Sequence, residues 1–179
     1  LAGRHGSAML SRKGGQVLSW VPKGHSEVLW VSPLATFEGS GPIRGGIPVC
    51  WPWFGMHPSD KSRPQHGLVR GECWNVVETT VDGALRMQAP EPVLDGLAVA
   101  LEVRVGEKLT LSLRSTNIGL HSATISEALH TYFRVGGLKM VRIGGLDGCD
   151  YADNNDPLAV GAPFGPIKRQ TGAVSFDDR

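Results

Sequence analysis

A strict alternation of apolar and polar side chains across residues 97–116 restricts the folds open to this chain. Every second residue from Leu97 to Val105 is aliphatic, and the pattern resumes from Leu109 to Leu113 after the turn residues 106–108. Successive side chains of a strand point to opposite faces of a sheet. This period of two therefore predicts an antiparallel hairpin with one buried face.

Weaker strand patterns occur along most of the chain. No window of eleven residues shows a convincing apolar stripe of period 3.6, and the 24 Gly and 12 Pro supply frequent turns. Many short strands with regular turns are typical of an all-β sandwich or barrel-like fold, and a length of 179 residues fits a single domain over 1–179. Further strands are predicted at 16–20, 27–31, 74–81, 84–88, 122–132, 139–143 and 172–176. A turn at 22–24 joins the first two of these into a second predicted hairpin.

Charge and cysteine content narrow the class of protein. The formal net charge of +1 gives no general electrostatic reason to expect a nucleic-acid or membrane partner. The three cysteines are far apart in sequence, which favours reduced thiols in a cytoplasmic protein. No spacing typical of a zinc site occurs, so we expect no metal. The basic residues near the N-terminus are not followed by an apolar run, so we expect no signal peptide, and both ends resemble cuts in a longer chain.

Residues 39–70 break the alternation and are rich in Gly, Pro, Trp and His. A loop of this length is usually functional or disordered, and its aromatic residues argue against disorder. We therefore expect a binding site here. Trp51, Trp53 and Phe54 could form a wall on which the apolar face of a sugar stacks, or could plug the end of the sandwich.

Basic and imidazole side chains in this loop are candidates for chemistry. Arg44 lies in an apolar context and needs an anionic partner such as a phosphate or carboxylate. The glycines that follow it, Gly45 and Gly46, would let the backbone approach a ligand closely. His66 and Arg70 are four residues apart. Imidazole donates or accepts protons near neutral pH, although a surface position would also explain His66.

Two candidates lie beyond the loop. On a strand, His130 would share one face with Tyr132. A strand histidine is more often a hydrogen-bonded core residue than a catalyst, so both interpretations stay open for His130. Asp147 lies in a glycine-rich turn, where aspartate often bonds only to the local backbone.

Four segments, taken in order, resemble a known family. The segments IRGGIPVCWPWFG, QHGLVRGECW, EALHTYFRVG and GLDGCDYAD resemble the glucose-6-phosphate 1-epimerase (hexose-6-phosphate mutarotase) branch of the aldose 1-epimerase superfamily. The resemblance extends from about Gly14 to the end of the chain. It implies a large antiparallel galactose mutarotase-like β-sandwich, or supersandwich, that is incomplete at its C-terminus. It also implies interconversion of the α and β anomers of a hexose 6-phosphate, a small-molecule substrate. Acid–base ring opening needs no cofactor, and we expect a monomer.

The resemblance also implies roles for individual residues. His130 would be the catalytic histidine, acting as the acid, and His66 the second histidine of the active site. The family's catalytic glutamate has no counterpart in this sequence, and Glu127 does not match its motif, so we expect the segment alone to be weakly active or inactive. The implied substrate-binding residues are Arg44, Gln65, Arg70 and Asp147.

Three other functions stay open at this point. The chain could be a non-catalytic carbohydrate-binding module on the same scaffold, although simple binding does not need two imidazoles. It could act on unphosphorylated aldoses, against which the two arginines argue. It could also be a cupin-like metalloenzyme with His57, His66 and His130 as ligands, but the expected HxH spacing is missing.

Overall fold

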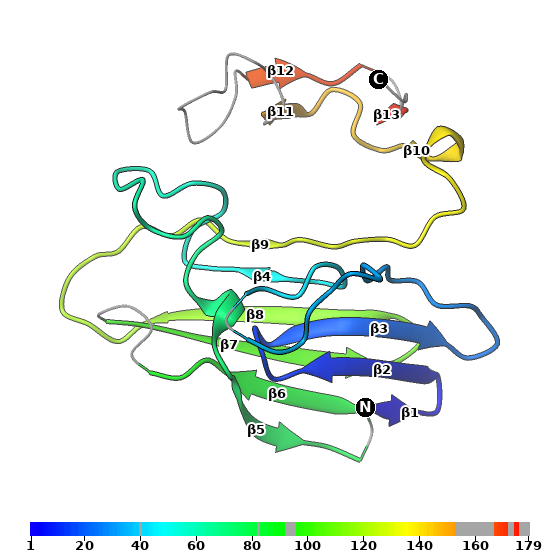
Figure 1. The fold of residues 1–179 in the computed structure, drawn as a ribbon, viewed down its shortest axis with the longest axis horizontal. Helices are drawn as coiled ribbons and strands as arrows, with labels where there is room; N and C mark the ends of the chain where they lie inside the picture. Colours follow the sequence, from blue (N-terminus) through cyan, green and yellow to red (C-terminus); the bar gives the residue numbers. More distant parts are fainter. Residues whose placement is uncertain (40, 82, 92–95, 153–166, 172–173, 176–179) are drawn as a thin grey trace.

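The computed structural model describes residues 1–39, 41–81, 83–91, 96–152, 167–171 and 174–175 (Figure 1). Within these ranges the regular structure consists of β-strands and two short 3-10 turns, η1 (Val69–Gly71) and η2 (Leu138–Met140). The prediction of an all-β fold is therefore confirmed. No helix in the described part of the chain is long and apolar enough to cross a membrane.

A four-stranded antiparallel sheet forms one layer of the sandwich. Its order is β5 (Asn75–Thr79), β6 (Ala84–Gln88), β7 (Leu97–Val105) and β8 (Leu109–Asn117). The hairpin predicted from the alternation is confirmed, since β7 and β8 pair along their whole length from Leu97–Asn117 to Val105–Leu109. The predicted strand 84–88 has its predicted bounds, and 74–81 is shortened to β5.

The other layer is the sheet of β1 (Ala2–Gly3), β2 (Gly6–Ser11) and β3 (Gln16–Pro22). Strand β3 was predicted, but its partner is β2 and not residues 27–31, so the predicted second hairpin is wrong. Residues 27–31 make only isolated bridges. One cause is Glu27, whose carboxylate accepts the backbone N–H groups of Trp20 and Leu29 at 2.9 and 2.8 Å and so occupies donors that a strand ladder would use.

The predicted strand 122–132 is reduced to β9 (Ala128–Leu129), which pairs with β4 (Val49–Cys50). Beyond β9 the pairing continues irregularly, because the N–H of His130 donates to the carbonyl of Pro48 at 3.0 Å. Proline lacks an N–H group and cannot return this bond, which prevents a regular ladder on this side. The segment that carries the candidate histidine nevertheless lies against the long loop.

The apolar residues of both sheets and of the loop share one core. Val17 on β3, Leu101 and Val103 on β7, and Trp51 and Val69 in the loop are almost completely buried in it. Strand β7 buries one face along its whole length, from Leu97 to Val105, whereas its other face changes from buried at Ala98 to exposed at Arg104. Strand β8 alternates between partly buried and exposed residues. Because Trp51 and Val69 belong to this core, the loop between them is tethered at both ends to the sandwich.

Two small strand pairs follow η2. Strand β10 (Arg142–Ile143) pairs with β13 (Val174–Ser175), and β11 (Asp150–Ala152) pairs with β12 (Ile167–Arg169). Figure 1 shows them together on one side of the molecule, beyond β4 and β9. The predicted strand 139–143 starts as the 3-10 turn η2, and the predicted strand 172–176 falls partly outside the described residues, which include only 174–175 of it.

Candidate functional site

His66 and His130 face each other, although 64 residues of sequence separate them. Their ring centroids are 6.1 Å apart and their planes are inclined by 68°. Phe54 contacts both imidazoles, with centroid distances of 5.0 Å to His66 and 6.1 Å to His130. The ring of Tyr132 lies next to that of His130, with a centroid distance of 4.8 Å, so the two side chains point the same way as predicted. The result is a half-buried cluster of two imidazoles and two aromatic rings.

The backbone of the loop determines where His66 lies. Its N–H donates to the carbonyl of Gly55 at 2.7 Å, and the Gly55 N–H donates to Nδ1 of the imidazole at 3.1 Å. His66 has φ = 68°, a left-handed conformation that is uncommon outside glycine. The next residue, Gly67, has φ = 85°, and a Cβ there would clash with the carbonyl oxygen of Trp51. The turn that presents His66 therefore depends on glycine at position 67.

Gly45 and Gly46 have a packing role that the sequence did not indicate. A Cβ at Gly45 would clash with the backbone at Val31, and one at Gly46 with the carbonyl oxygen of Val17. These glycines therefore allow close approach of protein backbone, so the structure gives a packing reason for them without a ligand. The approach still serves the site, because the carbonyl of Gly46 accepts the N–H of Tyr132 at 2.8 Å.

Arg70 influences the electrostatics of the cluster. Burial lowers the pKa of His66, and the positive charges of Arg70 and His130 lower it further. Burial raises the pKa of the Cys50 thiol, and the charge of Arg70 partly opposes this. Nε of Arg70 and Nδ1 of His130 are buried and have no hydrogen-bond partner in the described structure. Buried polar atoms of this kind normally have partners, so both atoms are candidates for ligand contact.

The other predicted substrate-binding residues lie farther out. Arg44 and Gln65 are exposed, and neither side chain makes a hydrogen bond or ion pair with the described residues. Arg44 precedes Gly45 and Gly46, and the carbonyl of Gly46 accepts the N–H of Tyr132. Asp147 is exposed in the turn between β10 and β11. The structure therefore brings together His66, His130 and Arg70 of the predicted set.

The loop aromatics divide between the two interpretations left open by the sequence. Trp51 and Trp53 are buried, and their indole N–H groups donate within the protein, to Ser115 Oγ at 2.9 Å and the Pro64 carbonyl at 3.0 Å respectively. Phe54 instead faces the imidazoles. The contacts of Phe54 and Gly55 with His66 could not be predicted from the sequence, because they join residues 12 and 11 positions apart in irregular backbone that has no period.

Glu127 is engaged outside the imidazole cluster. Its carboxylate accepts the hydroxyl proton of Ser115 at 2.8 Å, and Ser115 in turn accepts the indole N–H of Trp51. This hydrogen-bond chain links β8, the loop and the segment before β9. The described residues contain no group of three or more His, Cys, Asp or Glu side chains placed to hold a metal ion.

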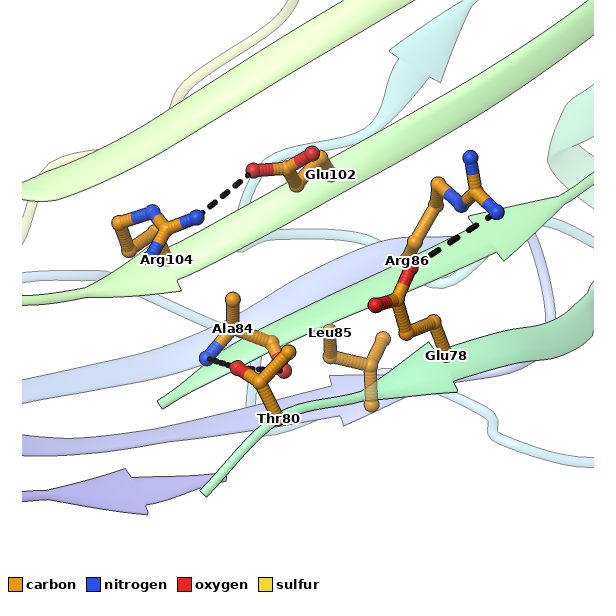
Figure 2. A pocket seen from close by; sticks show the side chains of 7 residues that line it. All are labelled: Glu78, Thr80, Ala84, Leu85, Arg86, Glu102 and Arg104. Carbon is orange, nitrogen blue, oxygen red and sulfur yellow. Dashed lines mark hydrogen bonds and ion pairs between the residues drawn. The ribbon is translucent and has the colours of Figure 1, made fainter. Parts of the chain in front are cut away.

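A separate polar pocket lies on the outer face of β5–β7 and contains none of the predicted site residues (Figure 2). Its charged side chains pair with each other, Arg86 with Glu78 at 3.8 Å and Arg104 with Glu102 at 3.2 Å. These ion pairs are exposed, and such pairs contribute little to stability.

The fold and the site together define a class of protein. The chain is an all-β antiparallel sandwich, and the two facing imidazoles beside its long aromatic loop form a candidate acid–base site. Residues 1–174 match the family model of aldose 1-epimerase. The chain belongs to the aldose 1-epimerase family. This membership contradicts the cupin-like alternative.

Individual relatives agree with this assignment. An Escherichia coli K12 protein named "Putative glucose-6-phosphate 1-epimerase" is 32% identical over 159 residues, which is 78% of this chain and 49% of that protein. A Cenchrus ciliaris protein of the same name is 35% identical over 159 residues, covering 79% of this chain and 47% of that protein. A crystal structure of a Salmonella typhimurium "putative mutarotase" superposes with a TM-score of 0.80 at 26% identity, over all of this chain and 60% of that one. The chain thus spans about half the length of its curated relatives.

Proposed function

We propose that this chain contributes the acid side of an active site that interconverts the α and β anomers of a hexose 6-phosphate. The observation that carries the proposal is the pairing of His66 and His130 at 6.1 Å. The printed names of the E. coli and Cenchrus ciliaris relatives support the choice of substrate. The unpaired thiols of Cys50, Cys73 and Cys149 suit work in the reducing cytoplasm.

The reaction requires proton transfer at two oxygen atoms. A base removes the proton from the anomeric hydroxyl O1 while an acid protonates the ring oxygen O5, and the C1–O5 bond breaks to give the open aldehyde. Rotation about C1–C2 and closure on the other face give the second anomer. Positioned acid and base groups each contribute roughly 10² to 10⁴ in rate. We assign the acid role to His130, with Phe54 as the surface on which the sugar packs.

Recognition of the phosphate is assigned to Arg70. Its buried Nε lacks an acceptor within the described structure, and a guanidinium matches the geometry of a phosphate. Gln65 and Asp147 enter the proposal through the motif resemblance alone, Gln65 as a substrate-binding residue and Asp147 as a contact to sugar hydroxyls. Arg44 enters as a second phosphate contact, from the resemblance and from its apolar sequence context. If Arg70 binds phosphate, glucose 6-phosphate will bind more tightly than glucose, which separates this function from action on unphosphorylated aldoses.

We assign the role of catalytic base to no residue of this chain. Glu127 is bonded to Ser115, and its motif does not match the family's catalytic glutamate. We therefore expect slow anomer exchange from the chain alone, and faster exchange when a small carboxylate such as formate is added to serve as the base.

Exchange NMR between the two anomers of glucose 6-phosphate tests this expectation. Formate should accelerate exchange in the presence of the wild-type chain beyond the acceleration that it gives without protein, and this protein-dependent part should fall by roughly 10² in His130→Gln. His25→Gln, at an exposed site, is the matched control and should behave as wild type. Saturable binding with no acceleration beyond the protein-free rate with formate would instead identify a carbohydrate-binding module. If the chain exchanged the anomers without formate as fast as a full-length relative does, the expectation that it lacks the catalytic base would be refuted.

A further inference from the structure

We propose that His66 is held by the backbone as the neutral Nε2–H tautomer, so that it acts as a fixed hydrogen-bond donor to a substrate oxygen and does not itself exchange protons. The tautomer follows from the structure alone, and its role toward substrate rests on the proposed function above. His66 is then a substrate-contacting donor, whereas His130 is the imidazole that changes its protonation state.

The first support is a reciprocal pair of hydrogen bonds with a single residue. Gly55 accepts the backbone N–H of His66 at 2.7 Å and donates its own N–H to Nδ1 at 3.1 Å. A backbone amide can only donate, so Nδ1 is the acceptor and carries no proton. In a neutral imidazole the proton must then reside on Nε2, as in other sites where a partner at one ring nitrogen decides the state of the other.

The second support is the conformation that makes this pair possible. His66 has φ = 68°, and Gly55 and Gly67 have φ = 77° and 85°. Left-handed backbone at a non-glycine residue is costly and persists where surrounding structure enforces it, often at functional sites. Here the enforcement comes from the core residue Trp51, whose carbonyl accepts the N–H of Leu68 at 2.8 Å.

The surroundings of the ring also oppose the imidazolium form. A proton on Nδ1 would face the Gly55 N–H and lose its acceptor. The charged or titratable groups beside the ring are Arg70 and His130, and burial together with these charges lowers the pKa of His66. Phe54, at 5.0 Å, adds an apolar wall and no charge.

The free edge of the ring then determines the ligand chemistry. Because Nδ1 is engaged by Gly55, only Nε2–H is left to contact a substrate, and it recognises an acceptor such as a ring oxygen or the oxygen of a hydroxyl. His130 differs, because its Nδ1 is buried without a partner in the described structure and no backbone N–H decides its tautomer. The two imidazoles therefore divide the work between a fixed hydrogen-bond donor, His66, and the proposed catalytic acid, His130.

Long-range ¹H–¹⁵N NMR of the ¹⁵N-labelled intact chain tests the tautomer directly at neutral pH. We expect an unprotonated Nδ1 and a protonated Nε2 for His66, and averaged tautomers for the exposed His25 and His121. A protonated Nδ1 in His66, or tautomer averaging like that of His25, would overturn the proposal. This readout is independent of catalysis, so it stands even if the chain does not bind hexose phosphates.

Two variants test the role toward substrate. In His66→Asn the side-chain oxygen can still accept the Gly55 N–H, but the donor toward substrate is lost. In His66→Gln the longer amide restores a donor near the position of Nε2. We expect His66→Asn to bind glucose 6-phosphate roughly five- to tenfold more weakly than His66→Gln, because one hydrogen bond is lost. Equal binding by the two variants would refute the donor role, whereas no binding by the wild type would refute the proposed function and leave the tautomer result intact.

Discussion

The two histidines of the candidate site are chemically the same side chain in different surroundings. Nδ1 of His66 has a backbone donor, whereas Nδ1 of His130 is buried without a partner among the described residues. A hydrogen bond to the neutral form and nearby positive charge both lower the pKa of an imidazole. The environment of each side chain, more than its identity, therefore decides which histidine can exchange protons.

The lowered pKa of His66 predicts how stability changes with pH. The unfolded chain binds a proton at His66 near pH 6.5, but the folded chain binds it only at lower pH. The unfolded state thus binds more protons, and the free energy of unfolding falls as pH drops from about 6.5 toward the folded pKa. Denaturant unfolding between pH 8 and 5 should show this loss in the wild type and a smaller loss in His66→Asn. An identical pH dependence in both proteins would contradict it.

At the scale of the element, the site depends on a tethered loop. Trp51 and Val69 anchor residues 51–69 in the core, and the turn at His66–Gly67 lies against the carbonyl of Trp51. The aromatic and glycine-rich composition of this segment predicted an ordered loop that carries a binding site. The contacts of His66 agree with the order, and the binding site stays a prediction. The particular contacts of His66 could not be predicted from the sequence, because irregular backbone has no repeating period from which to infer neighbours.

Gly67→Ala tests the importance of this turn, with Gly24→Ala as its matched control. Both glycines have positive φ, 85° and 77°, so both variants carry a backbone penalty of about 1 kcal/mol. Only at Gly67 would the added Cβ also clash, since nothing lies within 4 Å of the corresponding position at Gly24. We expect the free energy of unfolding to fall clearly more in Gly67→Ala, by roughly 2–4 kcal/mol. Equal losses in thermal or denaturant unfolding would show that the turn tolerates a side chain.

Strand prediction succeeded where side-chain burial alone decides the structure. Strands β7 and β8 alternate because one face meets the core, and their pairing was predictable from period two. Residues 27–31 have a similar composition, but the carboxylate of Glu27 takes backbone donors that a ladder would need. Strand β2 was missed because its glycine and serine residues leave little alternation, and because one of its two long apolar side chains, Met9, is 60% exposed. A hydrophobic pattern gives no information on which side chains compete for backbone hydrogen bonds.

At the scale of the molecule, the sandwich brings motifs that are far apart in the sequence together in one candidate site. The loop contributes Phe54, His66 and Arg70, and the segment after β9 contributes His130 and Tyr132. The motif resemblance predicted that His66, His130 and Arg70 belong together, and the structure brings them together. Asp147 lies with the small strand pairs shown apart from the two main sheets in Figure 1, and its role stays a prediction.

The central claim is that His66 and His130 bind one hexose phosphate molecule between them. Titrating glucose 6-phosphate into the intact chain, while recording the imidazole NMR signals of all six histidines, tests it most directly. We predict that the signals of His66 and His130 move along a single saturation curve, that glucose and inorganic phosphate each bind more weakly, and that His25 and His121 do not respond. Signals of His66 and His130 that follow different curves, or that stay unchanged at saturating sugar phosphate, would contradict the account.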